Sequence, residues 1–354
     1  RNMLSYSHLF GVHDVSVAAG TEARRNEYKG VSTTGYGWVP EFGEMFSPVE
    51  TSSYISTYGG NKPTNTNSFT QVASFFGIAS YCYDNRYVFN ANIRSDGSNK
   101  FGSDPKYRWL PTYSFAVKWI ASNESFLENA KWINNLSFRG SYGIQGNIHE
   151  SATPYLIVTV GDRDRVTGLP VSKISRLPNP DLRWEKTRDM KVALDFGLFD
   201  DRVTGLVEGY WRKSTDVISR VRVVSSTGYN AQSYNASDIE NKGVEATLGV
   251  KVIDRRDYKL SFSGNIAWNR NVLSKFSSPS GTVSEGKYVG YPLESIFGGK
   301  ELGIDPYDGI YMYKLRPDAV VNEASDLKSL VNYRYYLGTS IAPITGGFTL
   351  RFSY

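Results

Sequence analysis

The stretch YKLSFSGNIAWN, residues Tyr258–Asn269, alternates between two kinds of side chain. One set is apolar apart from a glycine: Tyr258, Leu260, Phe262, Gly264, Ile266 and Trp268. The intervening set is polar or small: Lys259, Ser261, Ser263, Asn265, Ala267 and Asn269. Successive side chains of a β-strand point to opposite faces, so this period of two predicts a strand with one wet face. The other face touches either a protein core or lipid.

The composition narrows the class of protein. Hydrophobic residues make up 40% of the 354 residues, and aromatic residues make up 14%. No run approaches the roughly 18 consecutive apolar residues of a membrane helix. A helical membrane protein is therefore excluded, whereas a membrane β-barrel is not, because its strands carry an apolar residue only at every second position.

Charge and rare residues exclude several other classes. The net charge of +5 comes from scattered Lys and Arg among 35 acids, which is not a nucleic-acid footprint. The single cysteine, Cys82, excludes an internal disulfide, and we expect it to be a small buried or lipid-facing residue in a strand. The three histidines, His8, His13 and His149, are far apart. No catalytic motif or cofactor motif occurs, so we expect neither an enzyme nor a bound cofactor.

Strand-like segments recur from one end of the chain to the other, and no convincing amphipathic helix separates them. The predicted strands are Asn2–Phe10, His13–Tyr28, Phe69–Tyr83, Arg86–Asp96, Tyr107–Ala121, Trp132–Gly146, Leu182–Phe199, Arg202–Lys213, Ser237–Ile253, Tyr258–Arg270 and Gly346–Tyr354. Most exceed the roughly 5–6 residues typical of strands in globular proteins.

The connections between these strands alternate in length. Tight turns are expected at Phe10–Val12, Asp84–Asn85, Asp200–Asp201 and Asp254–Asp257, with an intermediate link at Ser122–Lys131. Long polar loops lie between them: Lys29–Ser68, Gly97–Lys106, Asn147–Asp181, Ser214–Ala236 and Asn271–Thr345. An outer-membrane β-barrel sorts its connections in this way, with short turns at one end and long loops at the other. The sequence therefore predicts an all-β, antiparallel transmembrane β-barrel, and we place Leu260 and Phe262 against lipid and Trp268 at the membrane interface.

The predicted strand count requires further strands. An antiparallel sheet of eleven strands cannot close, and an open sheet would expose two edges, which the hydrocarbon region does not tolerate. The chain also begins RNMLSYSHLF, without an initiator Met or a signal segment. We therefore expect residues 1–354 to form one part of a single β-barrel domain within a longer protein.

Six stretches together resemble one family, the SusC-like TonB-dependent transporters of Bacteroidetes (SusC/RagA). They are RSDGSNKFG (Arg94–Gly102), LSFRGSYGIQGN (Leu136–Asn147), NPDLRWEKT (Asn179–Thr187), LFDDRVTGLVEGYWRKSTDVI (Leu198–Ile218), IENKGVEATL (Ile239–Leu248) and LGIDPYDG (Leu302–Gly309). Each stretch is short, but their order and spacing follow the family's barrel from near Val12 to the last residue.

The resemblance implies a barrel of about 22 strands around an N-terminal plug. The chain would supply the middle-to-late barrel, and the plug, the TonB box and the final strands would lie outside it. The implied function is active import of a large nutrient, a glycan or a peptide, across the outer membrane. The implied partners are a SusD-like surface lipoprotein, TonB acting through the plug, and the surrounding lipid and lipopolysaccharide, with no nucleic acid. A passive porin-like channel and a soluble β-rich carbohydrate-binding protein remain alternatives.

Candidate binding residues lie on the predicted wet faces and in the first long loop. Arg86, Asn92 and Arg94 share one face of a strand, and Arg139 lies on the wet face of another. In a barrel these side chains point into the lumen, where they contact either the plug or the passing solute. In the loop Lys29–Ser68, Tyr36 and Trp38 either stack on sugar rings or a partner, or pack the loop against itself.

Two further patterns favour structural roles. Asp305 and Asp308 in GIDPYDG are oxygen donors of the kind that bind Ca²⁺, but an Asx-type turn explains them better. Gly140, Gly143 and Gly146 mimic the spacing of a phosphate loop. They lie within a predicted strand, which favours close strand packing.

Overall fold

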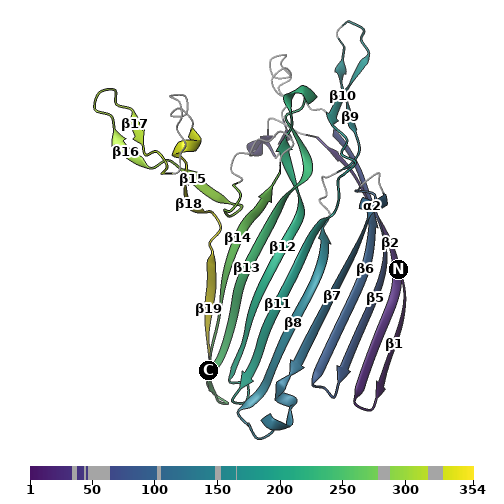
Figure 1. Ribbon diagram of the computed structural model, residues 1–354, viewed down its shortest axis with the longest axis vertical. Helices are drawn as coiled ribbons and strands as arrows, with labels where there is room; N and C mark the ends of the chain where they lie inside the picture. Colours follow the sequence, from purple (N-terminus) through teal and green to yellow (C-terminus); the bar gives the residue numbers. More distant parts are fainter. Residues whose placement is uncertain are drawn as a thin grey trace.

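A single antiparallel sheet forms the wall of the molecule (Figure 1). The computed structural model describes residues 1–33, 38–43, 45–46, 64–101, 105–147, 153–164, 166–277, 288–317 and 330–354. Its eleven strands, in spatial order, are β1 (Asn2–Phe10), β2 (His13–Ser32), β5 (Thr64–Tyr83), β6 (Tyr87–Ser98), β7 (Trp109–Ile120), β8 (Ile133–Asn147), β11 (Glu185–Leu198), β12 (Val203–Arg222), β13 (Ala231–Asp254), β14 (Lys259–Phe276) and β19 (Ile344–Ser353). Each strand pairs with its neighbours along the chain, and β1 and β19 are the two edges.

Smaller elements lie in the connections. Four two-stranded sheets are β3 (Trp38–Val39) with β4 (Met45–Phe46), β9 (Ile157–Arg163) with β10 (Pro170–Arg176), β15 (Ser295–Gly298) with β18 (Tyr335–Thr339), and β16 (Glu301–Ile304) with β17 (Tyr311–Tyr313). The helical turns are η1 (Pro40–Phe42), α2 (Pro105–Arg108), η2 (Ala121–Asn123), η3 (Ser125–Leu127), η4 (Ser225–Thr227) and η6 (Leu330–Tyr333). Across the described ranges, no helix has the length and hydrophobicity needed to cross a membrane.

The connections are sorted as the sequence predicts. Short turns join the strands at one end of the sheet, and the hairpins β9–β10 and β16–β17 project from the opposite end (Figure 1). Asp84 and Asn85 both have φ near +51°, the conformation of a tight hairpin turn. The Ser122–Lys131 link is at the short-turn end and contains η3.

Several strands differ in length from the prediction. β12 continues to Arg222 and β13 begins at Ala231, because the two strands pair as a hairpin beyond the predicted wall despite register shifts between Ser214 and Ile218. The strand expected from Leu182 begins instead at Glu185. Leu182 leaves the strand direction and is fully buried in a cluster at the loop end.

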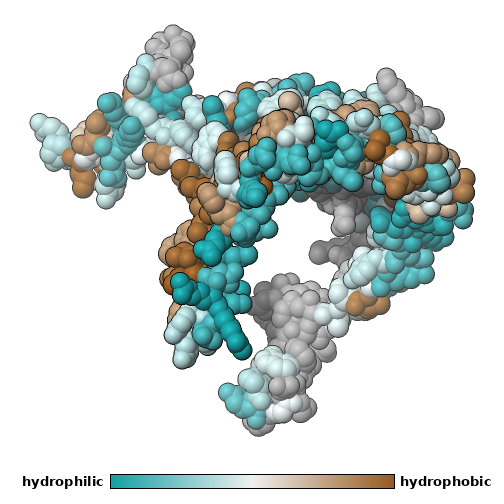
Figure 2. Space-filling view, turned by 90° about the horizontal axis from the view of Figure 1, so that it is seen from below, coloured by the Kyte–Doolittle hydropathy of each residue, from teal (hydrophilic) through white to brown (hydrophobic). Residues whose placement is uncertain are grey.

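The two faces of the sheet differ in polarity. Figure 2 shows a hollow that is mostly hydrophilic on the inside of the wall, with hydrophobic residues on the outer side near β19. Ile266 and Phe348 are 57% and 79% exposed, so these apolar side chains have no protein core to cover them. Aromatic pairs follow the outer face at the short-turn end, such as Trp132–Phe199 and Tyr258–Tyr354, whose ring centroids lie 5.9 and 5.4 Å apart.

Candidate functional site

The concave face of the wall carries ion pairs between neighbouring strands. On β11, Lys191 contacts Glu208 of β12 at 2.9 Å. On the same two strands, Asp189 contacts Arg212 at 2.7 Å. Because alternate residues of a strand share a face, these four side chains point to the same side as Asp195. The wall therefore presents both signs of charge to the lumen, and the pairs are held by the strand register.

Two of the predicted binding residues join a polar network on β6. Arg94 donates to Asp96 at 2.7 Å and to the Ser74 hydroxyl of β5 at 2.8 Å. Asn92 donates to the Ser114 hydroxyl of β7 at 3.1 Å. Arg94 also approaches Glu22 of β2, at 3.7 Å. The structure thus places Asn92 and Arg94 together on the concave face, with polar partners on three neighbouring strands.

Arg139 lies on the concave face of β8. Its guanidinium donates to both carboxylate oxygens of Asp195 on β11, at 2.8 and 3.3 Å. Lys118 of β7 is directly opposite Arg139 in the register. The side chain of Arg139 is 44% exposed, so the pair is accessible from the lumen.

Arg86 lies apart from the other three predicted strand residues, at the short-turn end of the sheet. β6 begins at Tyr87, so Arg86 is the last residue of the short turn that precedes this strand. Its guanidinium donates to Glu124, between η2 and η3, at 2.9 Å. Hydrogen bonds from Tyr87, Trp119 and Arg86 hold the pKa of Glu124 below its usual value, with Tyr87 the largest cause. Sequence reasoning missed Glu124 because two of these three partners, Tyr87 and Arg86, are 37 and 38 residues away.

The first long loop is described in part. Trp38 pairs with Phe46 in the short β3–β4 ladder and is 51% exposed. Tyr36, the other predicted loop aromatic, lies outside the described residues.

The carboxylates of GIDPYDG form a turn between β16 and β17. Asp305 accepts a hydrogen bond from the Tyr307 backbone N–H, and Asp308 accepts one from Ile310, both at 2.9 Å. These bonds are the Asx-type role expected from the sequence. The described residues contain no group of three or more His, Cys, Asp or Glu that could hold a metal ion.

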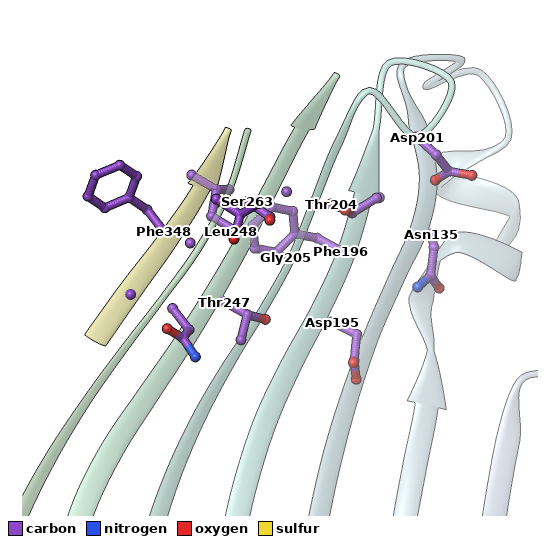
Figure 3. A pocket seen from close by; sticks show the side chains of 16 residues that line it. Asn135, Asp195, Phe196, Asp201, Thr204, Gly205, Thr247, Leu248, Ser263 and Phe348 are labelled. Atoms are coloured by element: carbon purple, nitrogen blue, oxygen red, sulfur yellow. The ribbon is translucent and has the colours of Figure 1, made fainter. Parts of the chain in front are cut away.

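A cavity of about 710 Å³ lies on the wall near the short turns (Figure 3). Asn135 and Asp195 on neighbouring strands lie on one side of it, and Phe348 of β19 points away from them (Figure 3). Gly197, Gly249 and other small residues line it, so the wall is thin there. Sequence reasoning did not identify this cavity, although small residues on the wet faces of β11, β13 and β14 are a visible signal.

The stretch NPDLRWE fixes the loop end of the sheet. Leu182 and Trp184 pack with Phe101 and Leu110 in a buried cluster. Beside it, Arg183 donates to Asp216 at 2.6 Å, and this hydrogen bond raises the pKa of the guanidinium. The loops that follow β6 and β8 are thereby joined to the extended β12–β13 hairpin.

The geometry defines a class of protein. A curved antiparallel sheet with a charged concave face, an apolar outer face with an aromatic band, and connections sorted by length is the wall of an outer-membrane β-barrel. The chain belongs to the family described as TonB dependent receptor-like, beta-barrel, whose model matches residues 4–349. The expected fold, the outer-membrane location and the resemblance to SusC/RagA proteins are confirmed.

Named relatives agree with this assignment. The chain is 29% identical to the TonB-dependent receptor SusC of Bacteroides thetaiotaomicron over 286 residues, which is 77% of the chain and 27% of SusC. It is 26% identical to the TonB-dependent receptor P3 of Formosa agariphila over 345 residues, 94% of the chain and 31% of that protein. The solved structure of the RagAB peptide transporter superposes with a TM-score of 0.81 at 24% identity, over 99% of the chain and 39% of its counterpart. The chain thus spans less than a third of the length of SusC and of P3.

Proposed function

We propose that the chain forms part of the barrel wall of an active importer, which carries a large nutrient across the outer membrane with energy supplied through TonB. The observation that carries the proposal is the concave face with its paired charges, in a chain of the TonB-dependent receptor family. A wall of this kind suits a lumen that is filled by a removable polar domain, because these paired wall charges keep their partners when that domain moves. No reaction is catalysed in this function.

A SusD-like surface lipoprotein is the proposed partner at the loop end. The similarity to SusC and the fold shared with RagAB support this partner. The cargo is a glycan or a peptide, and the wall contacts either the plug or the cargo through Asn92, Arg94 and Arg139. In the first loop, Tyr36 and Trp38 are the proposed contacts for cargo or lipoprotein.

The test is uptake by cells that carry or lack the gene. Deletion should abolish growth on one class of oligomeric nutrient, and an uncoupler of the proton-motive force should abolish uptake in the parent strain. A passive porin-like channel, the alternative, would keep uptake in the presence of the uncoupler. Purification in mild detergent should also recover a lipoprotein with the intact protein, and a preparation of the barrel protein alone would contradict the proposed partner.

A further inference from the structure

Two glycines interrupt the apolar outer face of the wall. Gly140 of β8 and Gly209 of β12 lie in one cross-strand row with Val117 of β7 and Val192 of β11. The two valines flank Gly140 and are 50% and 56% exposed, so about half of each side chain is uncovered. A Cβ added at Gly140 would lie 3.6 Å from a methyl group of Val117, and one added at Gly209 would lie 3.8 Å from a methyl group of Val192. Both distances are ordinary contacts, so the glycines leave open recesses in the wall.

The recesses belong to one groove of about 650 Å³, which we call the outer groove. Its floor takes one residue from each of β6, β7, β8, β11 and β12: Phe89, Val117, Gly140, Val192 and Gly209. Its lower side is the next outward-facing row toward the short turns: Tyr87, Trp119, Phe138, Leu194 and Val207. The outward-facing row beyond the floor begins with Phe115, Tyr142 and Met190. Large side chains therefore flank a floor that is low at its two glycines.

The lining of the outer groove is hydrocarbon apart from its lower end. There the Tyr87 hydroxyl and the Trp119 indole N–H both donate to Glu124 of the short turn. The residues between the two rows, such as Lys118 and Arg139, have their side chains on the concave face, because side chains alternate along a strand. An apolar ligand with its polar end toward the short turns is therefore favoured.

The outer groove has the length and slope to span one lipid leaflet. Five adjacent strands spaced about 4.8 Å apart make it about 19 Å long. It begins at Tyr87, the first residue of β6, and ends at Gly209, well inside β12, which begins at Val203. Strands of these barrels tilt by about 40°, so a row across them is inclined by about 50° to the membrane normal and rises about 12 Å. That rise is about half of the apolar band of about 25 Å.

We propose that the outer groove binds one acyl chain of a phospholipid from the leaflet at the short-turn, periplasmic end, with the methyl end of the chain toward Gly209. The proposal rests on the fold and the outer-membrane location, and it is independent of the import function. Lipid tails are as apolar as the groove, so hydrophobic transfer gives no preference for it. The preference comes from dispersion contacts, because the groove contacts a chain on its floor and sides, whereas a flat wall contacts one side only.

A protein partner fits the outer groove less well. Val117 and Val192 are two strands apart, about 9.6 Å between backbones, and their side chains take up part of this width. An α-helix with its side chains is about 10–12 Å across and cannot enter. A second copy of the barrel presents a convex wall, which could fill the groove only with single side chains. A second copy is therefore the rival occupant that the experiment must separate from lipid.

The experiment is photolabelling of the intact protein, with its native partners, in phosphatidylethanolamine vesicles. Two phosphatidylethanolamine probes carry a diazirine, one near the ester and one near the methyl end of an acyl chain. Peptide mass spectrometry then compares the labelling yield at groove residues with that at Phe262 and Ile266 on the outer face of β14. The filled variant combines Gly140→Val with Gly209→Val. Gly77→Val, which adds the same group to the outer face of β5 outside the groove, is the matched control.

We expect the ester-end probe to label Trp119 and Phe138, and the methyl-end probe to label Val192 and Gly209. Each yield should exceed that at β14 about fivefold, the preference expected from roughly ten additional carbon–carbon contacts. The filled variant should lose this excess, and Gly77→Val should keep it. Valine suits strand positions, and the gel mobility of the folded barrel checks that the filled variant folds. Gly140→Ala, which fills less of the groove, should give an intermediate yield.

Equal labelling of the outer groove and β14, or an excess that survives in the filled variant, would overturn the proposal. Probes that label in the reverse order would show a chain from the opposite leaflet and reject the assignment. Protection of the groove from both probes would show that protein covers it, as a second copy of the barrel would. These measurements do not depend on energised uptake, so their failure and a failure of the import function are distinguishable.

Discussion

Replacing Phe262 by arginine tests which face of the sheet contacts lipid. Phe262 lies on the outer face of β14, where its ring centroid is 6.3 Å from that of Phe348 on β19. Ser263, the next residue, lies on the concave face opposite Thr349. Phe262→Arg and Ser263→Arg therefore add the same cation to opposite faces of one strand, one residue apart.

The expected loss of stability depends on how deep Phe262 lies in the membrane, which follows from the aromatic residues at the two ends of the apolar stretch. Tyr258 stacks on Tyr354 at the short-turn end, and Trp268 lies ten residues further along the outer face. Ten residues at about 3.4 Å each, tilted by about 40°, span about 26 Å, which equals the apolar band of an outer-membrane barrel. Phe262 lies four residues from Tyr258 and hence near the middle of that band. An arginine there costs about 2–4 kcal/mol of stability.

The assay is urea unfolding of the intact protein in lipid vesicles, with the folded fraction read from gel mobility. Phe262→Arg should lower the free energy of unfolding by about 2–4 kcal/mol more than Phe262→Ala, which measures the loss of the ring alone. Ser263→Arg should change it by less than about 1 kcal/mol. If Ser263→Arg were the costly substitution and Phe262→Arg matched Phe262→Ala, the assignment of the two faces would be wrong.

Three further predictions concern the ends of the wall and its lumen. Leu182→Ala should destabilise the loop-end cluster by about 2–5 kcal/mol, seen as faster hydrogen exchange in residues 97–101 and 179–185 but not in residues 244–254, at the short-turn end of β13; unchanged exchange would reject the anchoring role. The pKa of Glu124 is lowered from its ordinary value of 4.5. Its hydrogen bonds therefore stabilise the folded protein fully at pH values above 4.5, and this stabilisation is lost as the pH falls through the lowered pKa. Glu124→Gln should therefore make the free energy of unfolding fall less steeply as the pH is lowered below 4.5. An unchanged pH dependence of that free energy would contradict the prediction. Arg139→Ala should cost less than about 1 kcal/mol, because its pair with Asp195 is half-exposed, and a larger loss in urea titration would show a buried role.

The regular wall was predictable because its signal is local. Alternation with a period of two assigns a face to each residue, and turn residues such as Asp84 and Asn85 mark where the chain reverses. The predicted strand boundary was wrong at Arg86, one residue before the strand begins. There the chain has not yet left the turn, and Glu124 of another connection supplies the partner.

The loop end was not predictable, because its contacts join distant parts of the chain. The Asn235 amide donates to the backbone oxygens of Arg183 and Asp216, which are 52 and 19 residues away. The Arg183 side chain likewise donates to Asp216, 33 residues away. Neither contact leaves a period or a spacing in the sequence, since each depends on how two loops pack together. The contacts that hold the loop end together were therefore missed.

The pairing of charges on the concave face affects how the wall responds to changes in the lumen. Along the concave face, Arg139 and Lys191 each contact a carboxylate on a neighbouring strand, so these wall charges are matched within the wall. A matched wall has little field with which to select a charged cargo, and it remains stable when the contents of the lumen change.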